Sequence, residues 1–126
     1  MATAVLVRGK EQRVYGGHPW IFRSDIARVE GEFSDGEVVR VASDRGQFLA
    51  MAVYNPRSQI TLRILSRREE PIDRAFITAR VHRALEYRRA FADLRSCRLL
   101  FAASDGLPAV IADAFDDVIV LHVLCL

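Results

Sequence analysis

The feature that most constrains the fold is a series of short, apolar, β-like runs between residues 4 and 65. Turns that carry glycine or proline separate these runs at intervals of about 8 to 12 residues, the spacing of a small sandwich or barrel. The expected strands are Ala4–Val7, Val38–Val41, Phe48–Tyr54 and Ile60–Leu65. The first half of the chain is therefore predicted to be mostly β structure around one core.

A short helical turn is expected between the first two of these strands. It runs from Lys10 to Tyr15 and stops at Gly16-Gly17, because glycine readily takes the left-handed conformation that ends helices. The pair His18-Pro19 then holds the backbone extended. We interpret the aromatic residues that follow, Trp20 and Phe22, as members of the core.

The sequence changes character at residue 69, and Pro71 is well placed for the first turn of a helix. No glycine or proline occurs between residues 72 and 96, which predicts one helix over 72–96. Its polar residues recur at three- and four-residue steps and form a solvated stripe. The apolar side is interrupted by Arg80, Arg83 and Arg88, whose charged ends either reach solvent or dock on RNA or on another domain.

The last segment is predicted to be a β-hairpin over 99–126, with a turn at Ser104–Pro108 and a second turn at Asp116-Asp117. The predicted fold class is therefore α+β, with one domain over 1–68 and a helix-plus-hairpin segment over 69–126. The closing run, Val118–Leu126, is almost wholly apolar. Because soluble proteins avoid uncovered apolar strands, we expect that the natural chain continues or that this edge forms a homodimer.

The charge balance alone does not identify a partner. The chain has 18 Lys and Arg against 16 Asp and Glu, a net charge of +2, which is too small to indicate nucleic acid by itself. Lys10 is the only lysine, and arginine suits phosphate and stacked bases through its planar donors. A bias towards arginine equally reflects genome composition.

One local constellation is suited to RNA. Cations surround the Gly-Gly turn and the aromatic segment after it, so that phosphates, a closely approached main chain and unpaired bases can be bound together. The candidate RNA-binding residues are Lys10, Arg13, Gly16, Gly17, His18 and Arg23, with Arg57 and Ser58 as further candidates.

Other functional classes find little support. Cys97 and Cys125 form no CxxC pair, and no histidine lies at metal-ligand spacing from either, so neither a metal site nor a disulfide is expected. No apolar stretch is long enough to span a membrane, and the N-terminal apolar run is too short for a signal peptide. We expect a cytoplasmic chain without a catalytic residue, because neither cysteine has an activating base or an electropositive pocket.

The order of several motifs resembles a known family. These motifs are Gly17-His18-Pro19-Trp20-Ile21-Phe22, Gly36-Glu37-Val38-Val39, Phe48-Leu49-Ala50 and Tyr54-Asn55-Pro56-Arg57-Ser58-Gln59-Ile60. Together they resemble the N-terminal PUA domain of class I methyltransferases that make 5-methylcytosine in large-subunit ribosomal RNA. The helix and the turn Ser104–Pro108 resemble the start of that family's central domain, although Ala102-Ala103 and Ala109-Val110 stand where the family usually has Gly-Glu and Gly-Leu.

The resemblance implies a PUA-like pseudo-barrel over 1–68 that binds ribosomal RNA, followed by the N-terminal part of a central α+β domain over 69–126. In the family, S-adenosylmethionine donates the methyl group, and a cysteine in a further catalytic domain attacks the pyrimidine. No glycine-rich loop for that cofactor occurs in this sequence. We therefore expect the catalytic domain and the cofactor site to be absent from this chain. Two alternatives remain open, a free-standing RNA-binding module and a protein-interaction barrel.

Overall fold

The computed structural model describes residues 1–124 and confirms the α+β class, with a curled, mostly β first part followed by a helix and antiparallel strands. The chain divides into two compact units, Met1–Glu70 and the part that begins at Pro71. We describe each unit by itself. The assignment of the second unit to a central domain stays a prediction.

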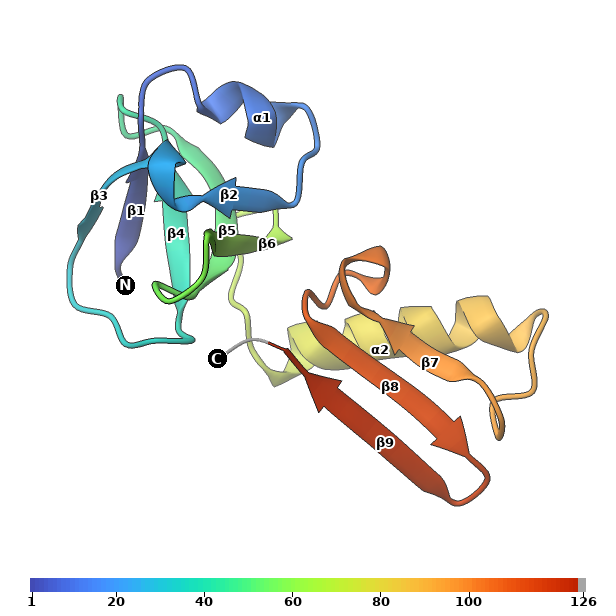
Figure 1. The fold of residues 1–126 in the computed structure, drawn as a ribbon. Coiled ribbons are helices and arrows are strands. Elements are labelled where there is room, and N and C mark those ends of the chain that lie inside the picture. Colours follow the sequence, from blue (N-terminus) through green and yellow to red (C-terminus); the bar gives the residue numbers. More distant parts are fainter. Residues whose placement is uncertain (125–126) are drawn as a thin grey trace. The chain divides into compact units, whose positions relative to one another are not determined.

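The first unit is one six-stranded sheet in the order β2-β6-β5-β4-β1-β3 (Figure 1). Its strands are β1 (Thr3–Leu6), β2 (Trp20–Phe22), β3 (Ile26–Glu30), β4 (Val38–Ala42), β5 (Phe48–Tyr54) and β6 (Ile60–Ser66). All neighbours are antiparallel except β1 and β4, which run parallel, with Ala4 opposite Val41. Four of these strands lie where the glycine-separated runs predicted them.

The core of the first unit is formed by small and branched side chains on the inner face of the sheet. Leu6, Val39, Val41 and Leu62 are fully buried there. Helix α1 (Glu11–Tyr15) lies over one end of the curled sheet, as Figure 1 shows, and adds Val14 to the same core. A single apolar residue therefore anchors α1, and most of its other side chains are left at the surface.

The second unit has helix α2 (Arg74–Arg89) and a three-stranded antiparallel sheet in the order β7-β8-β9. The strands are β7 (Arg98–Phe101), β8 (Val110–Phe115) and β9 (Val118–Val123), with the short 3-10 helix η2 (Ala102–Asp105) between the first two. Ala84 of α2 packs with Leu99 and Leu100 of β7 in a small core. This arrangement is the predicted hairpin segment, with its strand ends adjusted.

Helix α2 begins later than the predicted residue 72. Its N-cap is Asp73, whose Oδ1 accepts a hydrogen bond from the Phe76 N–H at 2.9 Å. An aspartate in this place satisfies one of the backbone donors that a helix start leaves free. Pro71 therefore lies before the cap and not in the first turn, which corrects the predicted start.

The helix also ends earlier than predicted, at Arg89 and not at residue 96. After the end, Asp93 Oδ1 accepts a hydrogen bond from the Arg95 N–H at 3.0 Å, a local bond that competes with helical geometry. The turn that follows lets Leu94 and Cys97 pack against the core of the second unit. Tertiary packing thus ends a helix in which no glycine or proline signals a stop.

Two arginines of α2 hold η2 in place. Arg88 makes a bidentate ion pair with Asp105, with N–O distances of 3.0 and 2.7 Å, and these side chains are only 13% and 10% exposed. Arg80 donates to the Gly106 carbonyl at 3.0 Å and lies 4.5 Å from the ring centre of Phe76. The sequence left two alternatives for these arginines, a charged end in solvent or a contact with RNA or another domain. Arg88 follows neither, because its charged end supports η2 from within the second unit.

Strand β9 is exposed along its whole length. Among the described residues it pairs only with β8, and its apolar side chains Ile119, Leu121 and Val123 are each more than half exposed. The predicted edge extends to Leu126, and its last two residues lie outside the described part of the chain. The exposed apolar strand that the sequence predicted is therefore present over Val118–Val123.

Candidate nucleic-acid interface

The predicted Gly-Gly turn ends α1, and only one of its two glycines is required by the backbone. Gly17 has a φ of +92°, where side chains are strained, and a Cβ added there would meet nothing within 4 Å. Gly16 has an ordinary φ of −73°. Arg67, at the end of β6, donates to the Val14 carbonyl at 2.6 Å and so supports the last turn of α1. The turn presents bare main chain at Gly17.

A buried carboxylate forms ion pairs with two cations at α1. Asp25 is 4% exposed and accepts hydrogen bonds from Arg13 at 3.1 Å and from the Phe22 N–H at 3.3 Å. Lys10 Nζ lies 3.8 Å from its other oxygen. The side chains of Lys10 and Arg13 nevertheless remain 47% and 41% exposed. Two cations and one carboxylate leave a positive charge that is free to meet a phosphate.

The aromatic segment after the turn faces outward, which corrects the interpretation of Trp20 as a core residue. Trp20 is 37% exposed and Phe22 is half-buried, whereas Ile21 between them is 2% exposed and enters the core. This alternation is the period of a strand with one buried face. The sequence contains a signal for this orientation, because the single aliphatic residue Ile21 stands between two aromatic residues and so marks the buried face of the strand.

The three rings of this segment lie close together. The imidazole of His18 is 5.9 Å from the Trp20 ring and 6.2 Å from the Phe22 ring, and its Nδ1 accepts a hydrogen bond from the Trp20 N–H at 3.2 Å. The guanidinium of Arg13 lies 5.3 Å from the Phe22 ring centre. Exposed rings beside a cation form a surface on which unpaired bases can stack.

The remaining candidates lie around the turn between β5 and β6. Arg23 donates to the Pro56 carbonyl at 2.6 Å and so ties the aromatic segment to this turn. Arg57 is exposed and lies 3.3 Å from Asp35. The hydroxyl of Ser58 accepts a hydrogen bond from the Ile60 N–H at 3.1 Å, which is a role within the turn itself. Arg23 and Arg57 therefore extend the cationic surface, whereas Ser58 shapes the loop.

Sequence reasoning missed two residues that organise this surface, Asp25 and Arg67. Neither belongs to a recognisable motif, and each acts through contacts with residues distant in the sequence. Within residues 1–124, no group of His, Cys, Asp or Glu is arranged to hold a metal ion. Cys97 is half-buried and unpaired, and Cys125 lies outside the described residues. No helix in the described part of the chain is long and apolar enough to cross a membrane.

The curled sheet, with α1 and the cationic surface at one end, matches a known domain family. The model of the PUA-like domain matches residues 5–67. The chain belongs to the PUA-like domain family. This match covers the first unit, in which all eight predicted RNA-binding residues lie.

Relatives of known name extend the similarity across nearly the whole chain. Ribosomal RNA large subunit methyltransferase I of Vibrio cholerae is 41% identical over 122 residues, which cover 94% of this chain and 31% of the relative. The protein of the same name from Citrobacter koseri is 40% identical over 124 residues, again covering 31% of the relative. The chain is homologous to these large subunit ribosomal RNA methyltransferases and spans less than a third of their length.

Solved structures share the fold at low sequence identity. A putative SAM-dependent methyltransferase from Streptococcus mutans matches with a TM-score of 0.78 at 18% identity, covering 96% of this chain and 32% of that one. A putative methyltransferase complexed with SAH matches with a TM-score of 0.80, also at 18% identity. The fold of this chain therefore recurs in proteins whose sequences have diverged widely.

Proposed function

We propose that this chain is the RNA-binding portion of an S-adenosylmethionine-dependent ribosomal RNA cytosine-5 methyltransferase, acting in the cytoplasm. It positions ribosomal RNA for a catalytic portion that lies outside this sequence, and the second unit belongs to the central domain of that enzyme. The methyl donor is bound, and the methyl group transferred, by the part of the longer relatives that this chain does not match.

The observation that carries this proposal is the joint exposure of cations and rings at one end of the first unit. Lys10 and Arg13 supply positive charge beside His18 and Trp20, so phosphate and base contacts are offered by one surface. A protein-interaction barrel would not need both kinds of group together. The names of the relatives support the same assignment, because they specify large subunit ribosomal RNA.

Binding of a large subunit ribosomal RNA fragment, titrated with salt, tests the proposal. With four cations at the interface (Lys10, Arg13, Arg23 and Arg57), the slope of log affinity against log salt is expected to be about −3, at ~0.7 per phosphate contact on single-stranded RNA. Replacing Lys10 with alanine is expected to reduce the magnitude of that slope by about 0.7. Fluorescence anisotropy with a labelled fragment measures both.

The matched control is Arg28→Ala, which removes an exposed positive charge of the same unit that lies on the edge strand β3, outside the four cations. Its slope is expected to stay closer to that of the unmodified chain than the Lys10→Ala slope does. Negligible binding that does not depend on salt would contradict an RNA-binding role. It would leave the protein-interaction barrel as the better description of the first unit.

We also propose a protein contact for the second unit, through the exposed strand β9. A second copy of this chain or a further segment of a longer chain would cover its apolar side chains. If a second copy does so, sedimentation equilibrium will show two chains, and replacing Ile119 and Leu121 with lysine will return the mass to one. A mass of one chain at every concentration excludes the second copy.

A further inference from the structure

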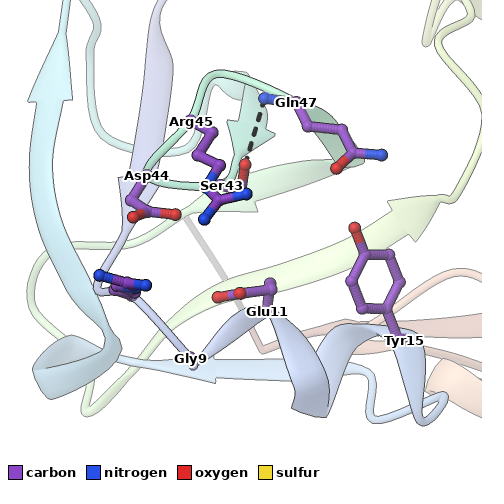
Figure 2. A pocket seen from close by; sticks show the side chains of 8 residues that line it. Gly9, Glu11, Tyr15, Ser43, Asp44, Arg45 and Gln47 are labelled. Carbon is purple, nitrogen blue, oxygen red and sulfur yellow. Dashed lines mark hydrogen bonds between the residues drawn. The ribbon is translucent and has the colours of Figure 1, made fainter.

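A cleft of the first unit lies outside the set of predicted RNA-binding residues. It has a volume of about 360 Å³ and opens between α1 and the turn that joins β4 to β5 (Figure 2). Its walls are formed by Arg8, Gly9, Glu11, Tyr15, Ser43, Asp44, Arg45 and Gln47. This volume is at the small end of the range for ligand clefts and admits one base with its sugar.

The cleft has a rigid rim on the side of the turn. The Gln47 N–H donates to the Ser43 hydroxyl at 3.2 Å, a bond drawn in Figure 2, and the Ser43 N–H donates to the Gln47 carbonyl at 2.9 Å. These bonds occupy the main chain and leave the Gln47 side-chain amide without a hydrogen bond among the described residues. An amide held on a closed turn is a positioned donor and acceptor.

The other wall carries a carboxylate that lacks a partner. Glu11 Oε2 is shielded from solvent and accepts no hydrogen bond from the described residues. A buried acceptor without a donor is costly. The last torsion of a glutamate side chain is broad, so the group can turn to present both oxygens to a ligand. The carboxylate can therefore accept from a ligand that offers two adjacent N–H donors.

An exposed ring stands beside this carboxylate. Tyr15 is 57% exposed and projects from the same helix as Glu11 towards the turn, as Figure 2 shows. Its ring makes no stacking contact with another described residue. A ring in this position offers the face of a stacking platform, which is how proteins hold a base that has left its helix.

The pattern of donors distinguishes between the four bases. Guanine alone has two adjacent N–H donors, at N1 and N2, on the edge that pairs in a duplex, and beside them the O6 acceptor. Glu11 can accept from both donors, and the Gln47 amide can donate to O6. Adenine and cytosine place an acceptor opposite the carboxylate, and uracil offers a single donor between two acceptors.

Two arginines complete the site. Arg8 and Arg45 line the cleft from opposite elements, the end of β1 and the turn after β4, and form no ion pair within residues 1–124. They are placed to bind the phosphates on either side of a nucleotide seated in the cleft. The acids Glu11 and Asp44 balance the charge of the two arginines. The cleft is therefore expected to bind a nucleotide in preference to free phosphate.

We propose that this cleft binds a single unstacked guanosine nucleotide of the RNA, with Tyr15 stacking on the base, Glu11 and Gln47 reading its edge, and Arg8 and Arg45 holding its phosphates. The inference rests on the proposed RNA-binding function. It adds a base-specific site to a surface that otherwise recognises phosphate and unpaired bases without sequence preference.

The test compares short, labelled, uridine-rich oligonucleotides that differ only in one central nucleotide. The full chain is expected to bind the oligonucleotide with a central guanosine about tenfold more tightly than those with adenosine, cytidine or uridine. Glu11→Gln is expected to reduce the preference for guanosine to within about twofold, because an amide can no longer accept from both N–H donors. Tyr15→Ala is expected to weaken the guanosine oligonucleotide to within about twofold of the others.

The control variants are Glu32→Gln, an exposed carboxylate of the same unit outside the cleft, and Tyr87→Ala, an exposed ring on α2. Both are expected to keep the guanosine preference. If all four oligonucleotides bind equally well, the guanosine site is wrong and RNA binding stands. If Glu11→Gln keeps the full preference in a folded protein, Glu11 does not read the base, and the proposal is also overturned. If no oligonucleotide and no ribosomal RNA fragment binds, both proposals fail together.

Discussion

Replacing Asp105 with alanine is expected to destabilise the second unit by about 3 kcal/mol, because it leaves a buried cation unpaired. Arg88 is 13% exposed and makes two hydrogen bonds to Asp105, whereas its third goes to the Ala84 carbonyl at 3.4 Å. The same carboxylate accepts a hydrogen bond from the Phe101 N–H at 2.6 Å, so this backbone donor loses its acceptor as well. Hydrogen exchange of the β7 and β8 amides measures the effect, since it reports on this unit alone.

The matched control is Asp117→Ala, which removes an exposed carboxylate from the turn before β9. It is expected to change stability by less than about 0.5 kcal/mol. If Asp105→Ala has as small an effect as this control, the ion pair does not support η2.

The same carboxylate gives the second unit a pH dependence of known sign. Burial raises the pKa of Asp105, but the hydrogen bonds from Arg88 and from the Phe101 N–H outweigh it and hold the pKa below its ordinary value of 3.8. The stability that ionised Asp105 contributes is therefore fully present above the unfolded value and is lost as pH falls through the folded value. The Asp105→Ala variant is expected to lose this part of the acid dependence.

Replacing Trp20 with alanine is expected to weaken RNA binding about tenfold or more through lost base stacking. The indole is exposed at the edge strand β2 and touches the ring of His18, so its removal opens no cavity in the core. A stacking contact neutralises no phosphate, and the slope of affinity against salt is expected to stay unchanged. Salt-titrated anisotropy separates this variant from Lys10→Ala, which changes the slope.

Trp20→Phe is the control for this prediction, because it keeps a ring in the same place. It is expected to retain most of the affinity, with folding checked by circular dichroism. Unchanged binding by Trp20→Ala would show that the exposed rings do not contact RNA. The interface would then depend on the cations alone.

Four strands of the first unit were predictable from the turns that separate them, whereas β2 and β3 were not. Strand β3 (Ile26–Glu30) contains two charged residues, and none of its apolar residues is fully buried. Among the described strands it lies at the edge of the sheet and pairs with β1 alone. An edge strand with little burial has no strong alternation to recognise.

The candidate site was predictable in its residues and not in its organisation. The cations beside the Gly-Gly turn are neighbours in sequence, so Lys10, Arg13 and His18 could be grouped by spacing. The carboxylate that gathers them, Asp25, lies twelve residues from Arg13 and carries no motif. Likewise, the role of Arg88 depends on Asp105 across a fold that spacing alone does not determine.

The pairing of β2 with β6 has a consequence for the order in which the unit acquires activity. Among the described strands, β2, which carries Trp20, pairs with β6 alone, and β6 lies some forty residues later in the chain. Contacts this distant form late, because the intervening loop must first be closed. In a nascent chain that has not yet emerged as far as residue 66, β6 cannot pair with β2, so the sheet that positions the cations and rings has not formed. The proposed RNA-binding surface is thus expected to form late, when the last strand of the sheet arrives.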